Sequence, residues 1–187
     1  METQNWPPAP LRWPEHPLSD GTISLDRMTI GDVPAVVAAI DDEILRWLPL
    51  PSPYREADAV TFLGWQASEA QQGTHLNFAV RTEGDFAGCA GLSFRGGPGV
   101  AEVGYWVGAG MRGRGIAARA TRLLAAYAFT TFQPRRVELL IQPENVVSCR
   151  AAEMAGAVAE GIRRAGIEQR GGVHDALVYS LLPGDVS

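Results

Sequence analysis

Alternation of apolar and polar positions predicts most of the strands in this chain. Residues 22–29 (Thr-Ile-Ser-Leu-Asp-Arg-Met-Thr) alternate regularly, which is typical of a strand with one buried face. The Glu-Gly-Asp sequence at residues 83–85 predicts a hairpin turn between two further strands. We expect strands at residues 22–29, 76–81, 86–94, 100–107, 136–142, 158–164 and 176–182.

Apolar residues at helical spacing fill the segments between these strands. Pro34 stands in a predicted first turn, and Gly73 and Gly156 stand where helices are expected to end. We expect helices at residues 34–45 and 55–72, from the segment 111–120 to residue 132, and at residues 145–155, with residues 47–54 as a rigid proline-rich loop. The order β-α-α-β-β-β-α-β-α-β-β predicts a mixed α/β fold of the α+β type.

Composition places the domain boundaries. Residues 1–19 contain five prolines interleaved with Trp6 and Trp13, so we expect either an extended arm, clamped to the body or to a second subunit, or a disordered tail. Residues 20–183 contain no repeat and no linker, which predicts a single domain, and residues 184–187 form a C-terminal tail. The sequence is compatible with either a monomer or a homodimer.

Charge and cysteine content exclude several classes of function. The net charge is −5 and the pI about 5.2, so we expect no nucleic-acid partner and no anionic membrane surface. Neither a membrane-spanning run nor a secretory signal is visible, which predicts a cytoplasmic protein. Cys89 and Cys149 form neither a disulfide framework nor a metal-ligand spacing, so no metal is expected.

The segment Arg112-Gly113-Arg114-Gly115-Ile116-Ala117 lies between a predicted strand and a predicted helix. Glycines let the backbone approach a ligand closely, and the unpaired N–H groups at a helix start favour phosphate. Arginine side chains add donors that suit phosphate. A Gly-x-Gly pattern alone is more typical of an exposed turn, so the rest of the chain has to decide between a phosphate cradle and a surface turn.

This segment and the order of elements resemble the Gcn5-related N-acetyltransferases, the GNAT family. The pyrophosphate motif of that family is Gln/Arg-x-x-Gly-x-Gly/Ala, whose fixed positions are filled here by Arg112, Gly115 and Ala117. The resemblance covers about residues 21–182 and is greatest to the RimJ/RimL-like subgroup, which acetylates the N-terminal alanine of ribosomal proteins. The resemblance to this subgroup also rests on residues 47–54, 102–107, 145–148 and 174–181.

The resemblance implies a central, mostly antiparallel twisted sheet that splays at the acetyl-CoA site, with flanking helices. Acetyl-CoA is then the acyl donor, with its pantetheine arm between two strands and a backbone N–H, for which Val107 is our candidate, on the thioester carbonyl. We expect one of Tyr105 and Trp106 to be ordinary core packing. The expected donor-binding residues are Tyr105, Trp106, Val107, Arg112, Gly113, Arg114, Gly115, Ile116, Ala117 and Asn145.

The resemblance also suggests the groups that move protons. Glu102 stands where many relatives have the carboxylate that takes a proton from the amine, and Glu168 is a weaker candidate. Ser148 matches a serine near the CoA sulfur and could give a proton to the leaving thiolate. The tyrosine that many relatives use as this acid is replaced by Ala152, and the usual Gly-Phe after the helix is Gly-Ala at residues 156–157.

Acceptor specificity is expected from the first two helices, their proline-rich loop and the last hairpin. Residues 41–43 are acidic and either attract a cationic amine or form a solvated helix face. His75 and His174 each stand alone in the sequence, and Cys149 is expected to be a small packing residue. The chain is therefore predicted to be an N-acetyltransferase acting on a protein N-terminus or a small amine, or else a catalytically weak acyl-CoA-binding relative.

Overall fold

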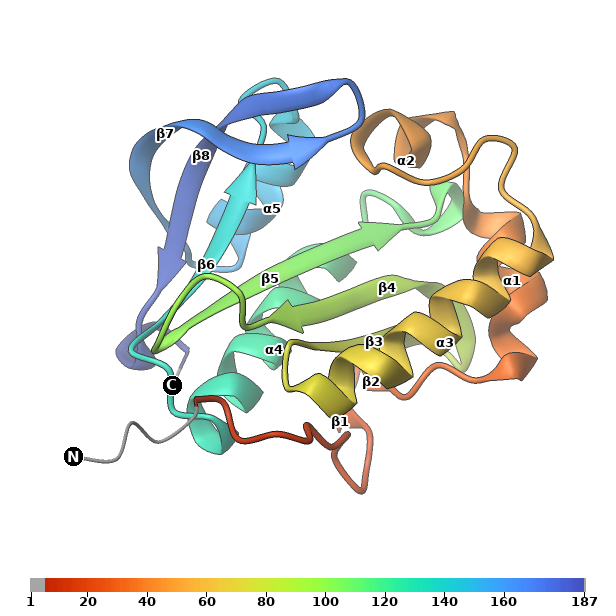
Figure 1. Cartoon of the computed structure of the whole chain (residues 1–187), viewed down its shortest axis with the longest axis horizontal. Coiled ribbons are helices and arrows are strands. Elements are labelled where there is room, and N and C mark those ends of the chain that lie inside the picture. Colours follow the sequence, from red (N-terminus) through yellow and green to blue (C-terminus); the bar gives the residue numbers. More distant parts are fainter. Residues whose placement is uncertain (1–5, 187) are drawn as a thin grey trace.

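A computed structural model describes residues 6–186 as one eight-stranded sheet with helices on both faces (Figure 1). The strand order is β1-β2-β3-β4-β5-β6-β8-β7, with β5 and β6 parallel and the other neighbouring strands antiparallel. The strands are β1 Leu18–Ser19, β2 Ile23–Asp26, β3 His75–Thr82, β4 Asp85–Ser93, β5 Val100–Val107, β6 Arg136–Ile141, β7 Val158–Gln169 and β8 Gly172–Leu181. The expected mixed fold with a mostly antiparallel sheet is confirmed.

Three of the strand predictions need correction in length. The first alternating segment pairs only over β2, because residues 27–29 lead instead into a 3-10 turn that the side chain of Asp32 caps at the backbone N–H of Thr29. The last two strands are longer than predicted and meet at a tight turn at Gly171–Gly172, whose φ angles of 92° and 123° suit glycine. Register shifts in β7 let this long hairpin bend.

The helices are α1 Val33–Ala39, α2 Asp42–Trp47, α3 Glu56–Gln72, α4 Ile116–Thr131 and α5 Val146–Met154. The prediction of one helix over residues 34–45 is wrong, because Ile40 is extended and Asp41 begins a second helix by accepting a hydrogen bond from the backbone N–H of Ile44 at 3.0 Å. The 55–72 helix is confirmed as α3, and it ends at Gly73 with a left-handed φ of 79°.

The two faces of the sheet carry separate apolar cores. Helices α4 and α5 pack on one face, where Phe78, Leu92 and Leu124 are fully or almost fully buried. Helix α3 packs on the other face of β3 and helix α1 on that face of β4, where a smaller cluster includes Val36 and Cys89 (Figure 1). The second cluster is smaller because much of that face lines an open cavity.

The described part of the N-terminal arm, residues 6–17, lies against the body. Trp6 donates its indole N–H to the carbonyl of Phe132 at 2.6 Å, and Trp13 donates to the carbonyl of Asn77 at 2.7 Å. Leu11 is only 3% exposed. The two tryptophans therefore hold this segment to its own domain, while residues 1–5 of the predicted arm and residue 187 of the predicted tail lie outside the described residues.

Strands β5 and β6 diverge, and this divergence positions the site. They are paired only at the start of β5, over Val100, Ala101 and Glu102, although β5 continues to Val107 (Figure 1). The remainder of β5 pairs with β4 alone. A wedge thus opens between two parallel strands, and the turn that leads into α4 lies at its wide end.

Candidate active site

The backbone of β5 presents polar groups to the wedge. Gly108 donates its N–H to the carbonyl of Ala87 at 3.0 Å, which fixes which amides of β5 face β4. Because successive residues of a strand point their N–H groups to opposite sides, the amides of Tyr105 and Val107 point away from β4. The carbonyl of Val107 points the same way and accepts from Arg112 at 2.9 Å. An extended ligand in the wedge could therefore pair with β5 as a further strand would.

The Gly/Arg segment is a turn with two left-handed glycines. Gly113 and Gly115 have φ of 76° and 73°, a conformation that a side chain would strain, and Gly115 is the N-cap of α4. The first backbone N–H groups of α4 have no partner within the helix and face the end of the cavity that Ile116 and Ala117 line. This part of the prediction has the geometry of an anion cradle.

Arg112 has a different role from the one suggested by its place in the motif. Its guanidinium makes two parallel hydrogen bonds to the Asp41 carboxylate, both 2.8 Å, besides the bond to Val107. The bonds from Arg112 hold the pKa of Asp41 below its usual range, since they favour the ionised form. The side chain of Arg112 therefore ties the start of α2 to the Gly/Arg turn, and Arg114 is the exposed arginine of the turn.

The start of α5 lies across the wedge from β5. Asn145 caps α5 by accepting from the backbone N–H of Ser148 at 3.1 Å. The phenol of Tyr105 lies 3.0 Å from the hydroxyl of Ser148 and donates to the Ser148 carbonyl at 3.1 Å. Burial raises the pKa of Tyr105, so its phenol is protonated at neutral pH. A phenol thus stands beside Ser148 although Ala152, farther along α5, provides none.

Glu102 lies where β5 and β6 part. Its carboxylate has no hydrogen-bond or ion-pair partner within residues 6–186, and its direct neighbour on β6 is Glu138. Burial first, and then repulsion by Glu138, raise the pKa of Glu102 above its usual range. Glu138 itself is bound by Arg136 at 3.0 Å and Arg163 at 3.1 Å. Glu102 is therefore the unpaired member of this group.

One cavity of about 990 Å³ joins the wedge to the face covered by α1 and α3. Its donor half is the part lined by the Gly/Arg turn, the wedge and the start of α5. Its acceptor half is the part beyond Glu102 and Trp106, lined by Trp47, Tyr54, Phe62, Trp65, His75 and Asn77. Trp106 points into this acceptor half, where its ring meets Phe86, whereas Tyr105 points to the opposite face. Glu168, on the final hairpin, also lines the cavity.

The final hairpin closes one side of the cavity. Arg170, at its tip, donates to the backbone carbonyls of Leu48 and Leu50 in the proline-rich loop. In Figure 1 the tip of β7 and β8 lies beside the segment that follows α2. These contacts link segments that are more than a hundred residues apart in the chain.

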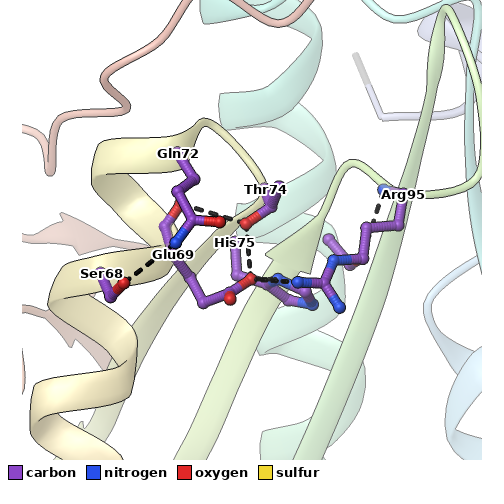
Figure 2. Close-up of polar contacts among 7 residues, drawn as sticks. Ser68, Glu69, Gln72, Thr74, His75 and Arg95 are labelled. Carbon is purple, nitrogen blue, oxygen red and sulfur yellow. Dashed lines mark hydrogen bonds and ion pairs between the residues drawn. The ribbon is translucent and has the colours of Figure 1, made fainter.

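The sequence reasoning missed His75. Its Nδ1 lies 2.7 Å from a carboxylate oxygen of Glu69 on α3, and the same oxygen accepts from Arg95 at 2.7 Å (Figure 2). The prediction that His75 stands alone is therefore wrong. Glu69 and His75 are six residues apart across a helix end, a spacing that signals nothing until the helix and the strand are placed.

The two cysteines are buried and protonated. Burial raises the pKa of the Cys89 thiol to about 12, and it also raises the pKa of Cys149. Cys149 lies in the first turn of α5, but this burial outweighs the effect of the helix start on its thiol. Both are thus packing residues. Among residues 6–186 no cluster of metal-ligating side chains is found, and no helix is long and apolar enough to cross a membrane.

Known proteins share both the sequence pattern and this fold. The family model described as "Acetyltransferase (GNAT) domain" matches residues 22–158. The Bacillus subtilis (strain 168) protein named "Putative ribosomal N-acetyltransferase YdaF" is 38% identical over 82 residues, which are 44% of this chain and 45% of that protein. The matching segments therefore span about half the length of the curated relatives.

Solved structures extend the likeness over almost the whole chain. Mycobacterium smegmatis RimJ in complex with CoA-disulfide has a TM-score of 0.79 at 24% identity, over 91% of this chain and 88% of that one. RimL, a ribosomal L7/L12 alpha-N-protein acetyltransferase in complex with coenzyme A, has a TM-score of 0.79 at 18% identity, over 92% and 100%. With the family match over residues 22–158, this chain belongs to the acetyltransferase (GNAT) domain family.

Proposed function

We propose that this protein transfers the acetyl group of acetyl-CoA directly to a primary amine. The observation that carries the proposal is the wedge between β5 and β6, with outward-facing amides along one side and an anion cradle at its wide end. The structures of RimJ and RimL, which share this fold, contain a form of coenzyme A. A long ligand with a pyrophosphate and an amide-rich arm matches the chemistry of the donor half.

The donor half would bind acetyl-CoA mainly through its backbone. The pyrophosphate takes the N–H groups of Arg114, Gly115 and Ala117 at the start of α4, supported by the helix dipole. The guanidinium of Arg114 adds charge from the exposed side of the turn. Asn145 caps α5 beside the pantetheine arm. Gly113 and Ile116 complete the turn, Gly113 by its left-handed φ and Ile116 by packing into the core.

Attack on the thioester places negative charge on its carbonyl oxygen. The amide of Val107 points into the wedge and is a suitable donor to that oxygen, in the manner of an oxyanion hole. The thiolate that leaves needs a proton, which Ser148 supplies from the start of α5. Tyr105 lies 3.0 Å from the Ser148 hydroxyl and replaces the proton that Ser148 gives up.

An amine must lose a proton before it attacks. Glu102 is the unpaired carboxylate next to the point where the wedge opens, and it takes this proton directly or through water. Its raised pKa brings it nearer to neutral pH, where a general base works best. A protonated amine over Gly104 would lie between the side chains of Glu102 and Trp106, since these residues flank Gly104 on the same side of β5.

The acceptor half is wide and aromatic, which suits a peptide N-terminus or an amine with a bulky apolar part. The name of the Bacillus relative points to a ribosomal protein as acceptor, and the name of RimL points to the N-terminus of L7/L12. Peptides with free N-termini are therefore the first acceptors to test, followed by small aromatic amines.

Two measurements test this function. Calorimetry with acetyl-CoA should give saturable binding with one site per chain, and its absence would refute the donor assignment. A thiol-release assay with peptides of varied N-terminal residue, and with aromatic and aliphatic amines, should then identify the acceptor. Binding without release for every amine would instead support an acyl-CoA-binding protein that does not turn over.

A further inference from the structure

A row of polar side chains crosses the sheet on the floor of the acceptor half. His75 on β3 lies directly opposite Ser93 on β4, and Ser93 lies directly opposite Glu102 on β5. Residues paired in this way share one face of the sheet, with Cβ atoms about 4.5–5.5 Å apart. All three line the cavity. The row therefore leads from the carboxylate beside the wedge to an imidazole two strands away.

The imidazole of His75 has one nitrogen committed and one available. Nδ1 lies 2.7 Å from Glu69, and because a carboxylate can only accept, Nδ1 carries the proton (Figure 2). Burial lowers the pKa of His75, so the ring is neutral near pH 7. A neutral ring with a proton on Nδ1 has its lone pair on Nε2. This ring can accept a proton at Nε2.

Several contacts hold this ring in place. Glu69 is bound at once by His75, by the hydroxyl of Thr74 and by Arg95, and its side chain is 8% exposed (Figure 2). The ring of Trp65 on α3 lies 5.1 Å from the imidazole, centroid to centroid. Buried carboxylates that order an imidazole raise its basicity by stabilising the imidazolium. The cluster thus has the parts of a positioned base.

Burial first, and then the charges of Arg95 and Glu138, bring the pKa values of His75 and Glu102 closer together. The charged groups that act on His75 are Glu69 from α3 and Arg95 from the turn between β4 and β5. Those that act on Glu102 are Glu138 from β6 and Arg163 from β7. The pKa of His75 is lowered while that of Glu102 is raised, which reduces the difference that a proton crossing the row must overcome.

We propose that His75, positioned by Glu69, receives the proton that the acceptor amine gives to Glu102. This inference rests on the proposed acetyl transfer and names the group at which that proton arrives. Glu102 is the catalytic residue that touches the amine, and Glu69 is a positioning residue. Ser93 and water in the cavity connect Glu102 with His75.

The steps balance in protons and charge. The ammonium gives one proton to the Glu102 carboxylate, leaving a neutral amine and a neutral carboxylic acid. The acid passes a proton through the Ser93 hydroxyl to Nε2, which restores the carboxylate and leaves an imidazolium bound to Glu69. The imidazolium returns to neutral by losing the proton to solvent, which reaches its partly exposed ring. Each turnover thus leaves the row as it began.

Two charge-removing variants have opposite effects on His75 and separate this proposal from a structural role. Glu69 raises the pKa of His75 and Arg95 lowers it. Glu69→Gln should therefore move the acid limb of the pH profile of kcat to lower pH, and Arg95→Gln should move it to higher pH, each by about half a unit or more. Arg95 is 59% exposed in its side chain, so Arg95→Gln leaves the fold in place.

Two further charge-removing variants change the pKa of Glu102 instead of that of His75. Glu138→Gln should lower the pKa of Glu102 and Arg163→Gln should raise it. If the acid limb of the pH profile moves only in Glu138→Gln and Arg163→Gln, the proton stops at Glu102 and the proposal is refuted. A third variant, His75→Gln, should lower kcat about tenfold or more at neutral pH and abolish the response of the limb to Arg95→Gln. His16→Gln, on the exposed arm, should change neither.

A second readout does not need turnover. The chain has three histidines, so the imidazole C–H signals in proton NMR are assigned by single substitutions, and the signal of His75 should titrate with opposite shifts in the Glu69→Gln and Arg95→Gln variants. If wild-type protein releases no thiol with any amine, the proposed function fails. If it does release thiol, two acceptors whose amines differ in pKa should give the same acid limb in the pH profile of kcat. If that limb then stays unmoved in both Glu69→Gln and Arg95→Gln, only the role of His75 is overturned.

Discussion

The donor half and the acceptor half of the cavity are built in different ways. Apart from the start of α5, the donor half is continuous in the chain, from β5 through the Gly/Arg turn into α4, and its recognition groups are mainly backbone amides. The acceptor half takes its side chains from α2, α3, β3, β4, β5 and the final hairpin. Backbone recognition depends on a local conformation, whereas the acceptor half depends on how distant segments pack.

The difference has consequences for substitution. A change in the Gly/Arg turn of the donor half should alter the affinity for acetyl-CoA and leave the proton-transfer groups intact. A change in the acceptor half should alter the rate and leave that affinity intact. The contact between Arg112 and Asp41 joins the two halves, so its loss should alter both the affinity for acetyl-CoA and the rate.

The largest effect is expected for Glu102→Gln. An amide cannot take a proton from the ammonium, so kcat should fall between about 10² and 10⁴-fold while calorimetry gives an unchanged Kd for acetyl-CoA. Asp85→Asn, on the exposed β3–β4 hairpin, is the matched control. A loss of acetyl-CoA affinity in Glu102→Gln would show that the two halves are not separable at this residue.

Ser148→Ala should come next, with kcat lowered about 10²-fold because the thiolate leaves without its proton. Tyr105→Phe should cost less than about tenfold, since Ser148 stays in place and water can replace the phenol. If the two act as one relay, the double variant should be no slower than Ser148→Ala. Additive losses in stopped-flow or steady-state rates would argue for two independent roles.

Gly115→Val should weaken acetyl-CoA binding by about tenfold, because a left-handed φ costs a residue with a side chain roughly 1–2 kcal/mol and the turn relaxes away from the cradle. The effect should appear in Kd and not in kcat at saturating donor. Gly64→Ala, in the middle of α3 with open space around it, is a control that should leave binding unchanged. If Gly115→Val and Gly64→Ala bind acetyl-CoA equally tightly, the turn is not part of the donor site.

Asp41→Asn should have the smallest effect. Both partners of the pair are about one-third exposed, at 34% for Asp41 and 32% for Arg112, so the free energy of unfolding should drop by at most about 1 kcal/mol. The pKa of Asp41 is lowered in the folded state, so its stabilisation is complete above the unfolded pKa and is lost as the pH falls through the folded one. Thermal unfolding at pH 7 and below pH 4 measures this, and a constant difference between variant and wild type would contradict the pair.

Local sequence signals predicted the donor half well. The turn at Gly113 and Gly115, the helix that begins near Asn145 and the strand over residues 100–107 each follow from a few neighbouring residues, and the structure has them in the expected elements. The roles of these residues toward acetyl-CoA stay predictions. The role of Arg112 could not be predicted, because its partner Asp41 lies 71 residues earlier in the chain.

The single helix expected over residues 34–45 shows the opposite case. Its apolar spacing is continuous, but the cap that Asp41 provides begins a new helix, and the bond from Arg112 holds that carboxylate in place. Local propensity favours one helix, and a tertiary contact favours two. The spacing of apolar residues cannot predict the effect of an ion pair such as Arg112–Asp41, whose members come from distant parts of the chain.

The sequence by itself determined most of the order of elements, the mixed α/β fold and the turn that marks the donor half, because periodicity, glycine conformations and helix starts are local properties. Only the tertiary structure decided which side chains meet: Tyr105 with Ser148, Glu102 with Glu138, and His75 with Glu69. Each of these contacts depends on strand register or on a helix packed across the sheet. Their acidities, and hence the path of the proton, follow from burial and neighbouring charge, which exist only once the chain has folded.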